Sequence, residues 1–295
     1  MTVRARITRS LAASLALGVL SSSSFAADPK VPPGADPGGI AVAMVGHGID
    51  YTDPEIAARL ARDGEGELIG WDFDENDRFP WAPAARNSAD PSGTELARRV
   101  IKTYKHARLV PIRISDMHPA NLAKVAALLM RTPARIVAMP AWGIDRAQWE
   151  PFRQAASLAG GLLLVVAAGD RSALAARAPL WPAAFRLDNV AAVAPATAFP
   201  NVAGPAAGEI AAAAVDGWVS APGETMFPML GARSEINAAE AVALAAGLAA
   251  CAQHTKPAAD GKAAKAALLA LARPAAGNPG LPVLDPMCWY GGMRN

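Results

Sequence analysis

The sequence predicts an α/β domain built as three layers, a mainly parallel, twisted sheet with helices on both faces. Two observations predict this class. Continuous apolar runs of about four to eight residues alternate along the chain with segments of helical period, and the connections between them are short. The composition also fits, since 52% of the 295 residues are hydrophobic and 18% are charged. Such a chain buries a large core and is not disordered.

The charge balance argues against a nucleic-acid partner. The 28 Lys and Arg residues are nearly matched by 26 Asp and Glu residues, which leaves a net charge of +2. Nucleic-acid binding needs a clustered basic field, and the sequence contains no motif of that kind.

The first 26 residues have the pattern of a secretory signal peptide. Basic residues precede the apolar run Leu11–Leu20, and small residues lead up to a cleavage site after Ala26. The apolar run is well short of the roughly 20 residues that span a bilayer, and no other segment is long enough. We therefore expect 1–26 to be removed, the mature protein to be periplasmic or secreted, and no membrane span to remain after cleavage.

The first strand is predicted at Ile40–Val45, after a Pro- and Gly-rich linker over 27–39. This run is continuously apolar, as are strands that are covered on both faces of a parallel sheet. A turn bracketed by glycines follows, and Asp53 and Pro54 are the N-cap and first residue of a predicted helix, Pro54–Arg62. Because ligands bind at the carboxyl ends of parallel strands, we expect the chemistry of the protein at this turn.

Strand and helix then alternate in order. The second strand is predicted at Leu68–Phe73. A helix follows, because apolar residues recur at i, i+3, i+4 and i+7 between Ala97 and Tyr104. The next strand is Leu109–Ile114, and the amphipathic helix Asn121–Met130 comes after it. A strand is predicted again at Ile136–Met139. This regular alternation with short connections implies right-handed crossovers in a mainly parallel sheet.

The C-terminal half continues this alternation. A helix is predicted at Trp149–Ala159, where it ends at a Gly-Gly pair. The run Leu162–Ala168 is the most strongly strand-like segment of the chain. A later helix has a face of small residues that continues through Leu244 and Leu248, which predicts a buried helix.

The end of the chain is less regular. An Ala- and Lys-rich helix is predicted at Ala258–Arg273, so the domain spans 40–273, and 274–295 is a Pro- and Gly-rich tail. Cys251 and Cys288 are the two cysteines. In an exported protein they could form a disulfide that anchors this tail.

Four segments, in order along the chain, resemble the subtilisin-like serine peptidases. They are Gly48–Glu55 (GIDYTDPE), Gly70–Pro80 (GWDFDENDRFP), Trp181–Val193 (WPAAFRLDNVAAV) and Ala221–Gly223 (APG). Their order and spacing agree with the family over nearly the whole mature chain. The resemblance implies the fold of that family, with its active site at the turn that follows the first strand.

The same resemblance assigns the family's catalytic positions. A peptidase of this family uses an Asp that orients a His, a His that takes the proton of a Ser, and an Asn that donates to the oxyanion. In this chain these positions fall on Gly46, Ser92, Ile236 and Asp170, respectively. A carboxylate at Asp170 accepts hydrogen bonds only and would repel an oxyanion. The resemblance therefore implies that none of the four catalytic groups is intact.

The register of the nucleophile has alternatives. Aligning on the small-residue helix places Ile236 at the nucleophile, and we favour this register. Anchoring on Gly231 places Arg233 there instead. A shifted register retains a hydroxyl at Ser234, which would otherwise serve as a helix N-cap.

These losses predict an exported subtilisin-like pseudopeptidase, catalytically inactive, with a binding or structural role. The alternative is an active serine endopeptidase that uses Ser234. A peptide or protein ligand is the expected partner, and it would pair with the backbone of the edge formed by Ala141, Trp142 and Gly143. Pro140 removes one backbone donor beside this edge, which would weaken the pairing.

His47 is the one histidine expected in the cleft. With Asp50 and Asp53 beside it, it suggests a metal site, but turn residues of these types more often cap a helix or face solvent. A dyad of His47 with Ser92 or Ser234 is another alternative, although it lacks an orienting carboxylate at the family's position. We expect no metal and no cofactor.

Overall fold

A computed structural model of the chain describes its regular elements and the loops between most of them. The described residues are 28–83, 92–169, 179–195, 219–221, 237–275 and 278–284. The helices are α1 (Pro54–Ala57), α2 (Gly93–Thr103), α3 (Pro119–Leu129), α4 (Arg146–Leu158), α7 (Ala238–Thr255), α8 (Gly261–Leu269) and the 3₁₀ turn η1 (Ala183–Phe185). The strands are β1 (Ile40–Gly46), β2 (Trp71–Asp72), β3 (Ala107–Arg113), β4 (Ile136–Met139), β5 (Leu163–Ala167), β6 (Val190–Pro195), β7 (Val219–Ala221), β8 (Ala272–Ala275) and β9 (Asn278–Leu284).

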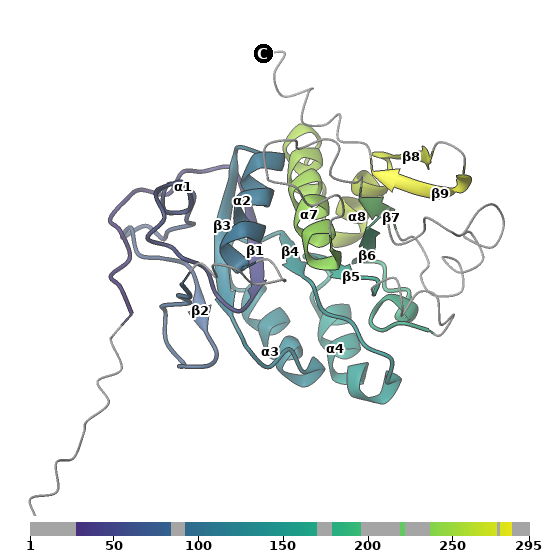
Figure 1. Cartoon of the computed structure of the whole chain (residues 1–295), viewed down its shortest axis with the longest axis horizontal. Helices are drawn as coiled ribbons and strands as arrows, with labels where there is room; N and C mark the ends of the chain where they lie inside the picture. The colour runs from purple at the N-terminus through teal and green to yellow at the C-terminus, as the bar shows by residue number, and fades with distance from the viewer. Residues whose placement is uncertain are drawn as a thin grey trace, which may run out of the picture.

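The strands of this described part form one sheet in the order β2-β3-β1-β4-β5-β6-β7-β9-β8. All neighbours are parallel except β8 and β9, which are antiparallel. The predicted mainly parallel sheet is confirmed. Four adjacent strands, β3, β1, β4 and β5, correspond to strands predicted from apolar runs, which are Leu109–Ile114, Ile40–Val45, Ile136–Met139 and Leu162–Ala168 (Figure 1). The chain moves from β1 to β3 on one side and then to β4 on the other, so the strand order reverses at β1. A reversal of this kind is where ligands bind in open α/β sheets.

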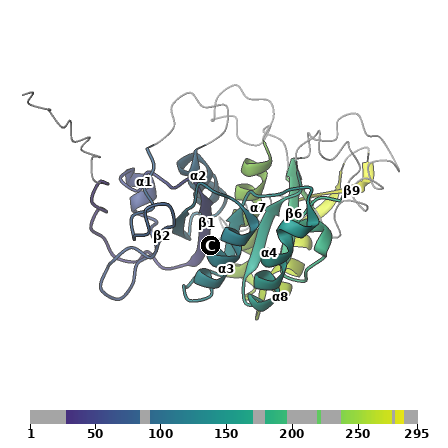
Figure 2. The same ribbon diagram turned by 90° about the horizontal axis from the view of Figure 1, so that it is seen from below.

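Alternate residues of β1 enter different cores. Ala41, Ala43 and Val45 pack with α3 and α4, whereas Val42 and Met44 pack with α2, α7 and α8. Successive side chains of a strand point to opposite faces, so an unbroken apolar run supplies both layers. In Figure 2, α1 and β2 lie at one end of the molecule and β9 lies at the other.

Helix α7 is buried on all sides. Every residue from Ala241 to Gln253 is buried, and Gly247 lies so close to α2 that an added Cβ would be 2.6 Å from the Cβ of Thr103. Small residues therefore let α7 lie between the sheet and α2. The predicted small-residue helix is confirmed. None of the helices in the described ranges combines the length and apolarity needed to cross a membrane.

Helix α1 is shorter than predicted. It ends at Ala57, because the chain turns so that the N–H of Ala61 donates to the Leu109 carbonyl at 2.8 Å and the N–H of Leu109 donates to Arg59 at 2.7 Å. Pairing with β3 therefore overrides the helical pattern up to Arg62. Its predicted cap is confirmed, since the Asp53 carboxylate accepts from the first helical N–H groups.

Three further elements differ from the prediction. Of the expected strand 68–73, only Trp71 and Asp72 form β2, although the Phe73 N–H also donates to the Arg113 carbonyl at 2.9 Å. Helix α8 ends at Leu269, and Arg273 lies in β8. The sequence does not predict β9, whose prolines disfavour a strand, but which lies beside β7 near the edge of the sheet where proline is tolerated.

Residues 28–39 have no helix or strand before Ile40, yet they are bonded to the domain. The Tyr51 hydroxyl donates to the Pro29 carbonyl at 2.7 Å, and the Arg62 guanidinium donates to the Pro32 carbonyl at 2.6 Å. Asp36 accepts from Arg108 at 2.8 Å. This segment therefore packs along the side of the sheet that carries β3.

Candidate functional site

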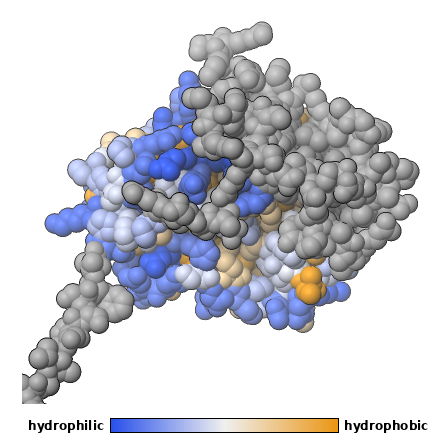
Figure 3. Space-filling model, viewed as in Figure 1, coloured by the Kyte–Doolittle hydropathy of each residue, from blue (hydrophilic) through white to orange (hydrophobic). Residues whose placement is uncertain are grey.

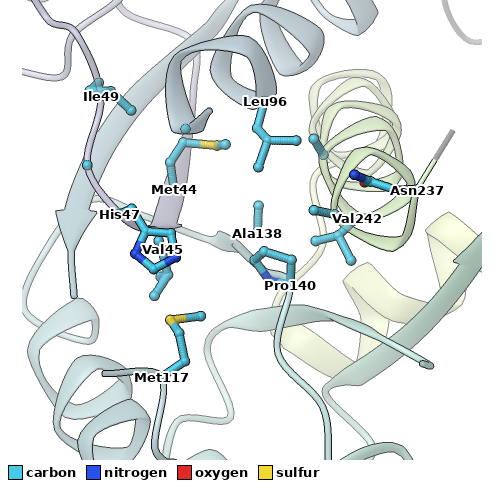
Figure 4. A pocket seen from close by; sticks show the side chains of 15 residues that line it. Met44, Val45, His47, Ile49, Leu96, Met117, Ala138, Pro140, Asn237 and Val242 are labelled. Atoms are coloured by element: carbon cyan, nitrogen blue, oxygen red, sulfur yellow. The ribbon is translucent and has the colours of Figure 1, made fainter. Parts of the chain in front are cut away.

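A cavity of about 210 Å³ opens where β1 and β4 end and where α2 and α7 begin. We call it the cleft pocket. Its walls are largely apolar: Met44, Leu96 and Val242 approach the same space from β1, α2 and α7 (Figure 4), with Met117 and Pro140 beside them. An apolar concavity at the carboxyl ends of parallel strands is the usual form of a ligand site in this class of fold.

Two of the lining residues, His47 and Asn237, carry polar side chains. The side chain of Asn237 accepts from the Glu240 N–H at 2.9 Å and so caps α7. His47 is exposed and follows directly after β1. The pocket therefore offers His47 as its one titratable side chain among the described residues that line it.

Gly46, at the position that the family resemblance assigns to the catalytic Asp, is the last residue of β1 and lines the pocket. A Cβ added there would meet no heavy atom within 4 Å. The place next to the strand end is open and carries no side chain.

Ser92, at the position assigned to the catalytic His, is the N-cap of α2. Its hydroxyl accepts from the Glu95 N–H at 3.3 Å and donates to the Glu95 carboxylate at 3.2 Å, while its own N–H donates to the same carboxylate at 2.7 Å. This reciprocal capping box uses the hydroxyl proton and one oxygen lone pair. The next residue, Gly93, lines the pocket and packs on Gly48, whose carbonyl oxygen would be 2.1 Å from an added Cβ.

The remaining catalytic positions lie outside the described residues. These are Asp170 and the candidates for the nucleophile, Ile236, Ser234 and Arg233. Description resumes at Asn237, directly before α7. Gly46, Gly93 and the start of α7 line one pocket, and Ser92 is not among the residues that line it.

The edge expected to pair with a peptide already has an internal partner. The N–H and the carbonyl of Gly143 are each bonded to Trp181 at 2.8 Å, and the Ala141 N–H donates to Met139 at 2.7 Å. The Arg146 guanidinium lies 5.4 Å from the Trp181 ring centroid. A peptide would have to displace the Trp181 pairing to use Gly143, and Trp142, partly buried, packs against both cores.

The carboxylates near His47 serve local structure. Asp50 accepts from the backbone and hydroxyl of Thr52 at 3.0 and 2.5 Å. Asp53 caps α1 and pairs with Arg98 at 2.5 Å. Burial alone would raise the pKa of Asp53, but the Arg98 guanidinium and two backbone N–H groups hold it below its ordinary value. The oxygens of these two carboxylates that would bind a metal already accept these hydrogen bonds.

Another acidic group lies beside β2. Asp28, Asp72 and Glu75 form the one set of three or more potential metal ligands within the described ranges. The Arg113 guanidinium sits among them, 2.9 Å from Asp72 and 3.0 Å from Glu75. A fixed cation therefore already neutralises part of this cluster. Burial, and then the charge of Glu75, raise the pKa of Asp28.

The sequence patterns did not identify the apolar side chains that line the cleft pocket. Leu96 lies in α2, Val242 lies in α7 and Met117 lies in the loop before α3, and no spacing connects them. The Ser-x-x-Glu spacing from Ser92 to Glu95 was the available signal for the capping box.

Cys251 is disulfide-bonded, and no cysteine in the described residues is free. Cys288, the chain's other cysteine, lies outside the described residues.

Comparison with known proteins finds similarity in structure. No family model matches the chain, and no curated protein matches it. Among solved structures, the nisin leader peptidase NisP from Lactococcus lactis is 14% identical, with a TM-score of 0.58 over 88% of this chain and 90% of that one. MycP1 with its N-terminal propeptide removed is 18% identical, with a TM-score of 0.56 over 86% and 91%.

A cold-adapted subtilisin-like serine proteinase is 16% identical, with a TM-score of 0.55 over 88% of this chain and 93% of that chain. The similarity extends along nearly the full length of each protein. Together with the sheet order and the position of the cleft pocket, it shows that this chain has the subtilisin-like α/β fold.

Proposed function

We propose that this chain is an exported pseudopeptidase of the subtilisin-like fold, which binds a peptide or protein at the cleft pocket without hydrolysing it. One observation carries the proposal: the Ser92 hydroxyl, at the position of the family's catalytic base, is bonded on both sides to Glu95 in a helix cap. A serine in a capping box cannot take a proton from a nucleophile at neutral pH.

Two features support the loss of chemistry. Gly46 has no side chain with which to orient a base, and the space beside it is open. The family register also places a carboxylate, Asp170, where an oxyanion needs a donor. In subtilisin, an example with measured effects, loss of the catalytic Ser or His alone lowers turnover about as much as loss of the whole triad, roughly 10⁶-fold.

The form of the pocket supports retained binding. Its walls are apolar and its volume of about 210 Å³ suits one or two aliphatic side chains rather than a folded domain. The internal pairing of Gly143 with Trp181 weakens binding by strand addition, so side-chain burial would supply most of the affinity.

Labelling with a fluorophosphonate tests the absence of chemistry, because this reagent reacts with activated serines. We expect no labelling and no cleavage of casein by the purified chain, with an active subtilisin as the positive control. The opposite outcome is cleavage of casein that persists with a chelator and that Ser234→Ala abolishes. That result would show that the chain is an active serine endopeptidase and would contradict the proposal.

Filling the pocket tests the binding role. Ala239→Phe places a ring in the pocket from the first turn of α7, and Ala263→Phe makes the same change at an exposed position of α8. We expect isothermal titration with a library of short apolar peptides to detect binding to the native chain and to Ala263→Phe, and at least tenfold weaker binding to Ala239→Phe. Equal affinities for the two variants would contradict a role for the pocket.

A further inference from the structure

Carboxylates lie beside several walls of the cleft pocket. Three of them are next in sequence to the lining residues Ile49, Leu96 and Met117, and a fourth reaches the pocket from the loop after β2. All four are exposed or half-buried, so their charges face solvent. We call them the acidic rim, and they are Asp50, Asp74, Glu95 and Asp116.

Asp74 is held close to the pocket by the loop that follows β3. Its carboxylate accepts from the Ser115 N–H at 3.0 Å and from the Ser115 hydroxyl at 2.6 Å, two residues before the lining residue Met117. Burial alone would raise the pKa of Asp74, but the bonds from Ser115 and the charges of Arg113 and His47 hold it below its ordinary value. Asp74 is therefore ionised at neutral pH.

The guanidinium nearest the acidic rim neutralises other carboxylates first. Arg113 lies 2.9 Å from Asp72 and 3.0 Å from Glu75, and its Nε is 3.6 Å from Asp74. Among the ion pairs within the described ranges, none includes a residue of the acidic rim other than Asp74. The rim therefore has more negative charge than the described cations balance.

The negative charge continues into the segment that follows the pocket turn. Ten Asp and Glu residues but only two arginines lie from Asp50 to Asp77, although the whole chain has a net charge of +2. This segment contains α1 and β2, and Figure 3 shows hydrophilic residues gathered on this side of the molecule. Burial, and then the charges of Asp28 and Asp77, raise the pKa of the Tyr51 hydroxyl. One side of the pocket therefore faces a negative field.

The spacing of the acidic rim suits an extended ligand rather than a single ion. Its members belong to four separate segments, and local hydrogen bonds hold them there: Asp116, for example, accepts from the His118 N–H at 3.0 Å and from the Asn121 amide at 2.9 Å. The one set of carboxylates in the described ranges that is close enough to share a metal ion contains none of the four. Several separate positive charges would match such a rim.

We propose that the peptide ligand of the cleft pocket is cationic: it buries an aliphatic side chain in the pocket and places Lys or Arg residues against the acidic rim. This inference rests on the binding role proposed above and adds the chemical class of the ligand. The apolar walls accept any aliphatic side chain of suitable size, so they discriminate poorly between peptides. The rim attracts a cationic peptide before contact and repels an anionic one, which supplies the missing specificity.

Three labelled peptides of equal length test the charge preference. They share a central Leu-Leu pair, and the residues on both sides of it are all Lys, all Gln or all Glu. We expect fluorescence anisotropy in about 50 mM NaCl to show that the full chain binds the Lys peptide at least tenfold more tightly than the Gln peptide, and the Glu peptide most weakly. In about 500 mM NaCl the ratio of the Lys and Gln affinities should fall below threefold, because salt screens exposed charges.

Two double variants locate the preference. Asp50→Asn with Asp116→Asn removes two charges of the acidic rim, while each Asn keeps an acceptor oxygen for the local turn. The control, Asp188→Asn with Asp260→Asn, removes two charges near the beginnings of β6 and β5, at the opposite end of these parallel strands. The rim variant should bind the Lys peptide at least fivefold more weakly, and the control should change the affinity less than twofold. If circular dichroism shows that the rim variant is unfolded, Asp116→Asn alone repeats the test.

Three results would overturn the charge preference: equal affinities for the Lys and Gln peptides, tightest binding of the Glu peptide, or equal losses in the two double variants. Ala239→Phe tests the pocket separately. Weaker binding of every peptide by this variant would leave the proposed binding role standing when the charge preference fails. No binding of any of the three peptides at 1 mM would contradict both.

Discussion

Arg99 and Glu240 form an ion pair that joins α2 to the first turn of α7. The Arg99 Nη2 donates to Glu240 Oε1 at 2.8 Å, and the side chains are only 6% and 12% exposed. The other oxygen of Glu240 accepts from the Asn237 N–H at 2.9 Å. One carboxylate therefore caps α7 and holds it against α2, and this fixes two walls of the cleft pocket relative to each other.

Breaking this pair should destabilise the protein strongly. Arg99→Met leaves the Glu240 carboxylate buried without its guanidinium, which typically costs about 3–5 kcal/mol of the free energy of unfolding. Urea denaturation measures the change as a lower midpoint at constant slope.

The control is Lys262→Met, which breaks an ion pair with Asp188 whose side chains are 70% and 72% exposed. Exposed pairs contribute about 0–1 kcal/mol, so this midpoint should barely move. Arg99→Met combined with Glu240→Gln should recover part of the loss, since Gln can still complete the capping box. Similar midpoints for Arg99→Met and Lys262→Met would contradict the role given to Arg99.

Replacing the serine at the α2 N-cap should lower stability. Ser92→Ala removes both hydroxyl bonds with Glu95 and should cost about 1 kcal/mol, whereas Ser92→Asp keeps an acceptor at a favourable helix N-terminus. Urea denaturation of the two variants compares them directly. A Ser92→Ala midpoint equal to that of the native chain would show that the cap contributes nothing.

Two glycines beside the pocket should differ in how much the same added methyl group destabilises the protein. Gly46→Ala meets open space and should change the free energy of unfolding by less than about 0.5 kcal/mol. Gly93→Ala places a Cβ 2.1 Å from the Gly48 carbonyl oxygen, so α2 must shift at a cost of about 1–3 kcal/mol. Thermal unfolding of both variants measures the contrast, and equal Tm values would contradict the close packing of α2 on the turn.

Acid should remove the stabilisation that Asp53 provides. Its pKa in the folded protein lies below the ordinary value of 3.8, because Arg98 and the backbone bonds outweigh the effect of burial. The stabilising contribution is therefore complete above pH 3.8 and is lost as the pH falls through the lower, folded-state pKa. Asp53→Asn should make the free energy of unfolding fall less steeply between pH 5 and pH 2, when it is measured by urea denaturation at each pH.

Asp28 should act with the opposite sign. Burial and neighbouring carboxylates raise its pKa above 3.8, so its contribution to stability is lost as the pH rises through the folded-state pKa. Asp28→Asn should therefore be more stable than the native chain at pH 7, and this gain in the free energy of unfolding should be smaller at pH 3. The same pH series measures it, and a stabilisation that is independent of pH would argue against a charged Asp28.

The central strands were predictable because a strand that is buried on both faces is a continuous run of apolar residues. Ile136–Met139 is apolar at every position, and the structure gives β4 the same bounds. Helix ends were less predictable where another strand competes, as at Leu60, which pairs with Leu109 instead of continuing α1. The residues that fix the cleft were hardest to predict. Arg99 and Glu240 are 141 positions apart, and neither spacing nor composition links them.

The burial of α7 on every side also determines when the chain can fold. The sheet face formed by β1, β4, β5 and β6 has its cover only once residues as late as Thr255 are present. A ribosome that has released β1 to β6 has made a chain in which, of the helices described on this face, only α2 is present, because α7 and α8 have not yet been synthesised. Fragments that end before Asn237 should therefore bind the dye ANS and aggregate, and acquisition of native structure should be a late event in the synthesis of this protein.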